Sequence, residues 1–243
     1  MIIEGINPVA EALSGGITVE KVYVQKGLFS DRLNRLIAEA RKKNIRLIFG
    51  EKEILDRLSP AKKHQGVLAF ATDFVYAELP SLIESARSAD KPSLWVLLEG
   101  IEDPHNLGAV IRVADCAGAT AVIIPKHRSA TVNDTVIRTS AGAAAYVPVA
   151  KVTNLNDAVR NLKEAGVRVF AADTDGETVY NTDLTGDTAI IIGGEDKGIN
   201  ALTRKLADGI ISLPQKGKIN SLNASVACGA LLYEAVRQRM PKQ

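Results

Sequence analysis

Three polar, glycine-containing segments carry the side chains of this chain that could do chemistry. They occupy residues 103–112, 193–198 and 213–225. Each follows an apolar run that is typical of a strand, at 94–98, 189–192 and 209–213 in turn. Each supplies amide, hydroxyl or single charged groups before a helical pattern begins. Because ligands bind beyond the carboxyl ends of the strands in an open α/β sheet, we expect the three segments to converge on one site.

Arg112 is the long cation of the first segment. It lies one helical turn after Gly108 in an otherwise apolar stretch. A guanidinium at this position is either a partner in a structural ion pair or a binder of an anionic ligand, and the spacing fits both. Asp103 and Pro104 are explained more simply, since they can cap the following helix and fix the turn before it.

The usual nucleotide-binding signatures are missing from the sequence. There is no GxxxxGK[ST] motif, and no GxGxxG follows the apolar run at 94–98. These absences argue against P-loop chemistry and against a small-molecule enzyme linked to NAD. The three histidines form no HExxH motif and no cluster with cysteine, so we expect no metal site.

The segments are positioned by alternating strands and helices. Helical patterns cover 108–117, 133–142, 155–165, 199–206 and 224–239, and strand patterns cover 94–98, 121–124, 167–172, 189–192 and 209–213. The strand patterns are continuous apolar runs, as expected when both faces of a parallel sheet are covered. We therefore predict a doubly wound α/β domain over residues 93–243.

The first third of the chain predicts a smaller α/β module over residues 1–75. Strand patterns at 21–25, 46–49 and 67–71 alternate with helical patterns at 8–13, 31–43 and 52–58. The module holds 12 Lys and Arg against 9 Asp and Glu, and its basic loop at 62–66 is either a nucleic-acid contact or an ordinary solvated loop. Residues 76–92 are bracketed by prolines and short of large apolar side chains, which predicts a linker.

The composition is that of a globular protein, with 243 residues of which 46% are hydrophobic and 24% charged, and a net charge of +2. No apolar run is long enough to span a bilayer, and the N-terminus lacks a signal-peptide pattern. Cys116 and Cys228 lie in apolar helical patterns without a CxxC pair. We expect two buried free thiols and a cytoplasmic protein without membrane contact.

The order and spacing of the three segments resemble the motifs of the SpoU (TrmH) family, in the SPOUT superfamily of RNA methyltransferases. The matching residues are Asn106, Gly108 and Arg112 in the first motif, Gly193, Glu195 and Gly198 in the second, and Leu213, Pro214, Gly217, Ser221, Leu222, Asn223 and Ser225 in the third. Residues 139–143 also look like a Ser-Ala-Gly stretch of this family. The resemblance covers residues 94–239.

The first third of the chain resembles one branch of that family. Residues 3–13 and 64–67 are similar to the ribosomal-protein-like module of the 23S rRNA guanosine 2′-O-methyltransferases (RlmB type). The resemblance implies a deep trefoil knot, S-adenosyl-L-methionine as cofactor and a homodimer that completes the active site. It implies 23S rRNA, free or in a ribosome assembly intermediate, as the partner. A tRNA or antibiotic-resistance rRNA methyltransferase, and a non-catalytic RNA-binding protein on the same scaffold, are the alternatives.

The resemblance also implies roles for individual residues. The catalytic set is Arg112, Asn106, Glu195, Ser221 and Asn223. The cofactor-binding set is Gly193, Leu213, Leu222, Thr139, Ser140, Gly142, Gly194 and Gly198, although both leucines fit plain core packing as well. The RNA-binding set is Lys62, Lys63, His64 and Arg112. Because arginine stays protonated at neutral pH, we expect Arg112 to hold a substrate phosphate and orient the 2′-hydroxyl, and Glu195 to fix the loop geometry.

Overall fold

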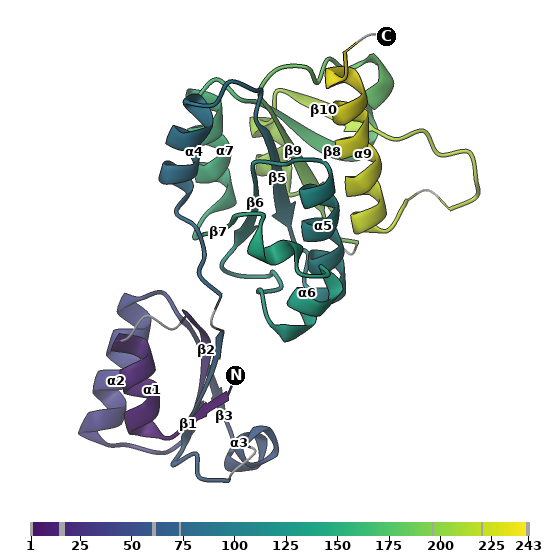
Figure 1. The fold of residues 1–243 in the computed structure, drawn as a ribbon. Helices are drawn as coiled ribbons and strands as arrows, with labels where there is room; N and C mark the ends of the chain where they lie inside the picture. The colour runs from purple at the N-terminus through teal and green to yellow at the C-terminus, as the bar shows by residue number, and fades with distance from the viewer. Residues whose placement is uncertain are drawn as a thin grey trace. The chain divides into compact units, whose positions relative to one another are not determined.

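The computed structural model describes residues 2–14, 18–59, 62–72, 74–195, 197–219 and 221–241. It divides into two compact units, Met1–Val75 and Tyr76–Gln243, which Figure 1 shows as separate bodies of helices and strands. The first unit contains β1 (Ile2–Glu4), α1 (Ile6–Ser14), β2 (Thr18–Gln25), α2 (Asp31–Lys42), β3 (Arg46–Gly50), α3 (Lys52–Leu58) and β4 (Val67–Thr72).

The first unit is a four-stranded mixed sheet in the order β1-β4-β2-β3. Strand β4 pairs antiparallel with β1 and β2, whereas β2 and β3 are parallel. Helix α2 packs one of its faces into the core of this unit, because Leu33, Leu36 and Ala40 recur at helical spacing and are buried. The helix is capped by Ser30, whose side chain accepts a hydrogen bond from the Leu33 amide at 3.2 Å. The three buried residues of α2 share a core with Val9 of α1 and with the sheet.

The second unit has a longer succession of elements. It contains α4 (Leu79–Arg87), β5 (Leu94–Glu99), α5 (Pro104–Cys116), β6 (Ala121–Pro125), α6 (Asp134–Thr139), η1 (Ala143–Ala145), β7 (Val149–Val152), α7 (Leu155–Glu164), β8 (Arg168–Thr178), η2 (Val179–Asn181), β9 (Thr188–Gly193), α8 (Ala201–Leu206), β10 (Gly209–Ser212) and α9 (Ala224–Arg239). The predicted doubly wound α/β architecture is confirmed.

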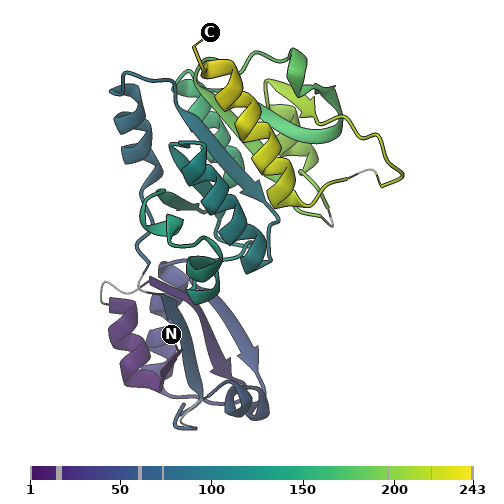
Figure 2. The same cartoon turned by 45° about the vertical axis from the view of Figure 1, so that its right-hand side comes forward.

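The sheet of the second unit has the order β10-β8-β9-β5-β6-β7, and all neighbouring strands are parallel. Its central strand β5 is buried on both faces, as the continuous apolar run predicts. Helices α4 and α7 lie on one side of the sheet and α5 and α9 on the other (Figures 1 and 2). All strands are parallel, so their carboxyl ends meet at one edge.

The segment 76–92, which the sequence predicts to be a linker, contains helix α4. Leu79 and Ile83 are buried in the core beneath this helix, so it belongs to the second unit. Pro80 lies in the first helical turn, where its missing N–H and fixed φ are favourable, so this proline starts a helix. Strands β1 and β7 were also absent from the sequence-based elements, because three and four residues are too few for a clear pattern.

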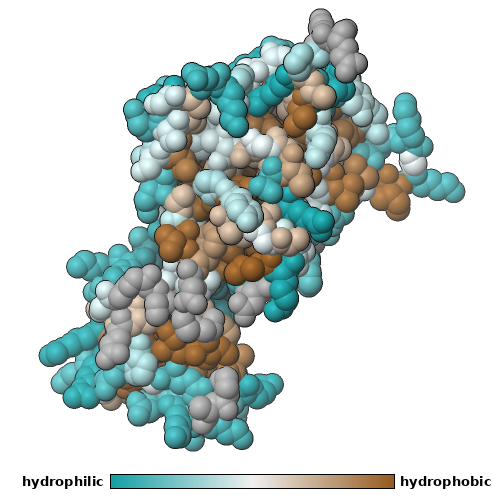
Figure 3. Space-filling view, viewed as in Figure 1, coloured by the Kyte–Doolittle hydropathy of each residue, from teal (hydrophilic) through white to brown (hydrophobic). Residues whose placement is uncertain are grey.

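Helices α5 and α9 pack against each other through small side chains. A Cβ added at Gly229 would lie 3.4 Å from Val113, so part of the small-residue pattern of α9 serves packing within the chain. The solvent side of α9 and the loop before it keep apolar residues: Ile219 is 74% exposed and Val226 56%. Figure 3 shows this apolar surface around the start of α9. No helix in the described part of the chain is long and apolar enough to cross a membrane.

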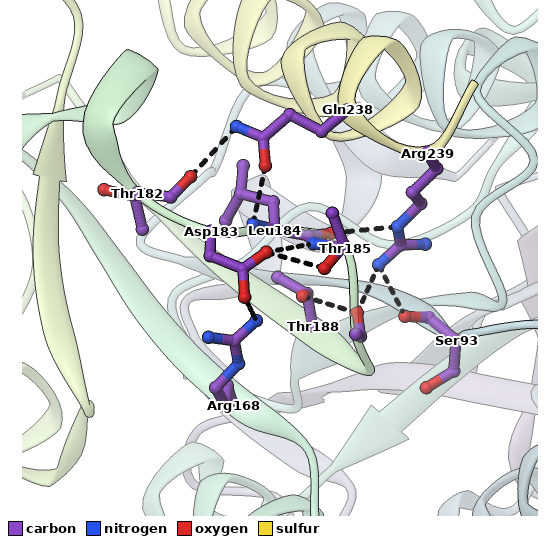
Figure 4. Close-up of polar contacts among 10 residues, drawn as sticks. Ser93, Arg168, Thr182, Asp183, Leu184, Thr185, Thr188, Gln238 and Arg239 are labelled. Atoms are coloured by element: carbon purple, nitrogen blue, oxygen red, sulfur yellow. Dashed lines mark hydrogen bonds and ion pairs between the residues drawn. The ribbon is translucent and has the colours of Figure 1, made fainter. Parts of the chain in front are cut away.

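A polar network fixes the C-terminal end of α9 against the amino edge of the sheet (Figure 4). Arg239 donates to the carbonyls of Leu184 at 3.0 Å, Ser93 at 3.1 Å and Gly186 at 2.7 Å. Burial lowers the pKa of the Arg239 guanidinium from its ordinary value. Gln238 continues the network, since its Oε1 accepts from the Leu184 amide at 2.8 Å. Both apolar packing and hydrogen bonds therefore hold the last helix in place.

Candidate active site

The three polar segments meet at the carboxyl edge of the second sheet, as the sequence predicts. Asn223 Nδ2 donates to Asn106 Oδ1 at 2.9 Å and to Glu195 Oε1 at 2.8 Å. Asn106 Nδ2 donates to the same Glu195 oxygen at 3.4 Å. One residue from each segment thus joins a closed network, in which Glu195 accepts from both amides. Glu195 links the loops in this geometry, which agrees with the positioning role expected for it.

Local capping places the two amides. Asp103 is the N-cap of α5 and its carboxylate accepts from the His105 amide at 3.0 Å, so Asn106 falls in the first turn of that helix. Asn223 is the N-cap of α9 and accepts from the Ser225 amide at 3.0 Å through its Oδ1. Its Nδ2 is thereby turned toward the other two segments.

A glycine-lined pocket of about 200 Å³ opens beside this network. It is formed by the middle of β8, the ends of β9 and β10 and the first two turns of α9. The predicted site residues that line it are Gly193, Gly194, Glu195, Gly198, Leu213, Ser221 and Leu222. Its walls are completed by apolar residues such as Ile192, Ile211 and Leu231. The pocket therefore combines exposed backbone with apolar walls, which is the lining that a flat heterocycle on a polar ribose requires.

Two glycines of the second segment are required by their surroundings. A Cβ at Gly193 would lie 2.6 Å from the Gly198 carbonyl carbon, and a Cβ at Gly194 would lie 2.2 Å from the Gly100 carbonyl oxygen. The family resemblance places both glycines in the cofactor-binding set. In the structure these glycines also let the chain fold closely onto itself, which shapes the pocket wall.

Arg112 is exposed on α5 and does not line the glycine-lined pocket. Among the residues that the structure describes, no carboxylate forms an ion pair with it. The anion-binding role, one of the two interpretations that its position allows, stays a prediction. Ser221 lies at the pocket mouth and is exposed.

Thr139, Ser140 and Gly142 do not line the glycine-lined pocket of their own chain, and the cofactor role expected for them stays a prediction. Thr139 packs against α5, where a Cβ at Gly108 would lie 2.7 Å from the Thr139 Cβ. Ser140 is buried and donates to the Ile137 carbonyl at 3.0 Å, and Gly142 adopts a positive φ of 87°. In a single chain this stretch shapes the α5–α6 contact.

The basic loop of the first unit divides into two parts. His64 is buried, its Nε2 lies 2.9 Å from Asp56 Oδ1, and its Nδ1 accepts from the Gly66 amide at 2.9 Å. The hydrogen bond from His64 holds the pKa of Asp56 below its ordinary value. Both ring nitrogens are thus used within the protein, and the RNA contact by His64 stays a prediction. Lys62 and Lys63 are exposed, as an RNA contact would require.

The two cysteines differ. Cys228 is buried, and burial raises the pKa of its thiol to about 12, as expected for an inert core cysteine. Cys116 is exposed at the end of α5, so the prediction that it is buried is wrong. It lies on the side of the helix away from the sheet, which a short apolar pattern does not reveal. Within the described residues, no group of three or more His, Cys, Asp or Glu could hold a metal ion.

Family models match both units. Residues 93–233 match the SpoU rRNA Methylase family, and residues 2–77 match the RNA 2′-O ribose methyltransferase substrate-binding family. The chain is 42% identical to the 23S rRNA (guanosine-2′-O-)-methyltransferase RlmB of Xanthomonas campestris pv. campestris, covering 98% of this chain and 96% of that protein. It is 40% identical to an uncharacterized tRNA/rRNA methyltransferase of Mycolicibacterium vanbaalenii, covering 98% of this chain and 76% of that protein.

Solved structures agree with these matches. The SpoU methyltransferase AviRb of Streptomyces viridochromogenes, in complex with its cofactor AdoMet, has a TM-score of 0.61 and 28% identity over 98% of this chain and 90% of that chain. A structure described as an RNA 2′-O ribose methyltransferase has a TM-score of 0.58 and 28% identity over 98% of this chain and 88% of that chain. The protein therefore belongs to the SpoU family of rRNA methylases.

Proposed function

We propose that the protein is an enzyme that methylates the 2′-hydroxyl of a guanosine ribose in 23S rRNA, with S-adenosyl-L-methionine as methyl donor. The observation that carries this proposal is the network of Asn106, Glu195 and Asn223, which joins all three family motifs at the mouth of the glycine-lined pocket. The relative named as a 23S rRNA guanosine methyltransferase supports the substrate. We place the reaction in the cytoplasm, where ribosomes are made.

The residues of the pocket fit this cofactor. Leu213 and Leu222 offer apolar walls to the adenine, and the backbone around Gly193 and Gly194 presents polar groups that can read its edge. When bound, S-adenosylmethionine supplies an electrophilic methyl group on a sulfonium. The structural relative with AdoMet bound supports the same site.

The side chains of the site act by positioning. Asn106 and Asn223 are held by Glu195, so the loops that meet the ribose are fixed before RNA arrives. Arg112 binds a phosphate of the RNA and orients the neighbouring 2′-hydroxyl. The Ser221 hydroxyl donates or accepts a hydrogen bond at the pocket mouth. Holding a hydroxyl in line with the methyl group makes a bimolecular step effectively unimolecular, which is worth several orders of magnitude in rate.

A homodimer completes this site in our proposal. Arg112 lines no wall of the glycine-lined pocket in its own chain, so it serves the pocket of a second copy. Val226, Ala230 and Tyr233 form an exposed stripe at helical spacing on α9, next to α5, which is the surface we propose for dimerisation. The Thr139–Gly142 stretch beside α5 would then reach the cofactor across the dimer. The chain around the second and third motifs forms the trefoil knot of the family.

The N-terminal unit selects the RNA. Its match to a substrate-binding family supports this role, and the exposed Lys62 and Lys63 are the phosphate contacts we propose. A ribosome assembly intermediate would present its guanosine unpaired. Proteins recognise unpaired nucleotides most easily, because the edges of their bases are exposed.

The proposal is tested with radiolabelled S-adenosylmethionine and, separately, unmodified 23S rRNA, 16S rRNA and tRNA. We expect label in 23S rRNA as 2′-O-methylguanosine, and loss of label with Arg112→Ala. Label in tRNA alone would agree with the family assignment but would show that the substrate is tRNA and not 23S rRNA. Cofactor binding without label in any RNA would favour a non-catalytic RNA-binding protein.

A further inference from the structure

A second cavity lies beside the glycine-lined pocket, beyond the carboxyl ends of β5, β6, β7 and β9. It has a volume of about 650 Å³, and we call it the polar cavity. It shares Gly194, Glu195 and Gly198 with the glycine-lined pocket, and Asn106 also lines it. A molecule in the polar cavity is therefore a direct neighbour of the cofactor, where a methyl acceptor has to be.

Two amide side chains that line this cavity are anchored by their oxygens. The Oδ1 atoms of Asn154 and Asn200 accept hydrogen bonds from the Asn156 amide and the Leu202 amide, at 2.9 Å in each case. The Nδ2 groups of these two residues have no partner among residues 74–195, 197–219 and 221–241 that the structure describes. Each amide is thus anchored by its oxygen and leaves two N–H groups for a ligand with acceptor atoms.

One carboxylate that lines the cavity can accept hydrogen bonds from a ligand. Glu99 accepts from the Asn200 amide at 3.2 Å and from the Thr203 hydroxyl at 3.1 Å, and Asp103 caps α5. Glu195 accepts from two amides. Glu102 is exposed, lines the cavity and has no partner within the described part of the chain.

Three cationic or titratable side chains complete the lining. His127 and Arg128 follow β6 and Lys197 follows β9, and all three are exposed. The loop after β6 is held by a hydrogen bond from the Ala130 amide to the Ile101 carbonyl at 2.7 Å. Neither Arg128 nor Lys197 forms an ion pair with a carboxylate of the described residues, so both cations are available to phosphate.

From these groups we infer that the polar cavity holds the base of the target guanosine together with its adjoining phosphate, an assignment that rests on the proposed function. Guanine carries acceptors at O6 and N7 and donors on its N1–N2 side, whereas adenine has a donor in place of O6. The free amide N–H groups match the acceptors, and the Glu102 carboxylate matches the donors. Arg128 and Lys197 bind the phosphate.

The first test measures binding of guanosine 5′-monophosphate to the full chain by equilibrium dialysis, with S-adenosylhomocysteine present to fill the glycine-lined pocket. We expect guanosine monophosphate to bind at least about tenfold more tightly than adenosine or cytidine monophosphate, the size of one bidentate base contact. Glu102→Gln should remove this preference, and Arg128→Ala should weaken all three nucleotides alike. Arg160→Ala, an exposed arginine on α7 outside the cavity, is the matched control and should change nothing.

The second test measures methylation of unmodified 23S rRNA at varied RNA concentration. We expect Arg128→Ala and Asn154→Ala to raise KM for RNA about tenfold, while S-adenosylhomocysteine binding stays as in the wild type. Unchanged KM in both variants, or nucleotide binding that Glu102→Gln and Arg128→Ala do not alter, would overturn the assignment even with an active enzyme. A wild-type protein that methylates no RNA but binds guanosine monophosphate through these residues would keep the cavity and overturn the proposed function.

Discussion

The two edges of the second sheet carry similar side chains and use them in opposite ways. At the amino edge, Arg239 donates to four carbonyls, and Asp187 accepts from both the amide and the hydroxyl of Ser93 at 2.7 Å. On α5 and at the carboxyl edge, respectively, Arg112 and Arg128 have no ion-pair partner among the described residues. Buried polar groups need partners, so the amino edge obtains them from the chain itself. The carboxyl edge leaves its donors for a ligand, and this difference separates a stabilising arginine from a functional one.

The largest expected effect that tests this contrast is on the rate of methyl transfer. Arg112→Ala should lower methyl transfer by about 10²–10³-fold, the loss typical of one donor that acts on the reacting group, measured by single-turnover labelling of 23S rRNA. The temperature of unfolding should stay unchanged because the side chain has no described partner to lose. Arg112→Lys should stay impaired, since an ammonium cannot bind a phosphate in bidentate geometry. Near-full activity of Arg112→Lys would contradict the phosphate role.

The next effect is on cofactor affinity. Gly194→Ala places a Cβ 2.2 Å from the Gly100 carbonyl and so pushes the end of β9 away from the end of β5. We expect S-adenosylhomocysteine to bind about 10- to 100-fold more weakly, which corresponds to an overpacking cost of roughly 1–3 kcal/mol, measured by calorimetric titration. Gly217→Ala is the control, because its Cβ would have no heavy atom closer than 4.0 Å. Equal affinities in both variants would show that the close approach does not shape the pocket.

At the amino edge the effect should appear in stability. Arg239→Ala removes the guanidinium that donates to the carbonyls of Pro92, Ser93, Leu184 and Gly186. We expect the free energy of unfolding to fall by about 2–3 kcal/mol, as for lost hydrogen bonds to a charged group, measured by urea titration. The rate per folded molecule, under conditions where the variant stays folded, should match the wild type. A loss of rate without a loss of stability would erase the distinction between the two edges.

The smallest expected effect is on the stability of the fold at acidic pH. The Asp183 carboxylate accepts from the Thr185 hydroxyl and amide and pairs with Arg168, which lowers its pKa to about 2 (Figure 4). A pKa depressed in the folded state adds stability above the unfolded value of about 3.9 and loses it as the pH falls toward 2. Asp183→Asn should therefore lower the urea midpoint slightly at pH 5 and by less at pH 3. Equal differences at both pH values would exclude this contribution.

Sequence patterns predicted the parts of the site that are local. The glycines and amides of the three segments sit where strands end and helices begin, so their types and spacing indicate both the turn and its chemistry. The start of α5 lies four residues earlier than the apolar pattern suggests, because Asp103 caps it and Pro104 occupies the first turn. The pattern of apolar residues does not register such polar first turns.

The remaining parts depend on contacts between distant segments. Arg128, Asn154 and Asn200 belong to no motif, and only the neighbouring positions of β5, β6, β7 and β9 bring their loops around one cavity. The two internal hydrogen bonds of His64 are another example, since its place in a basic loop does not reveal them. Exposure and partners of single side chains are set by tertiary packing, which a single sequence does not contain.

The wall formed by Gly194, Glu195 and Gly198 borders both cavities, and this shared wall has a thermodynamic consequence. Whatever shift of these residues accompanies the filling of one cavity also alters the other. Linkage then requires that cofactor and RNA change each other's dissociation constants by the same factor. The size of this factor depends on how far these three residues can move, and the side chains of Asn106 and Asn223 hold one of them, Glu195, by hydrogen bonds.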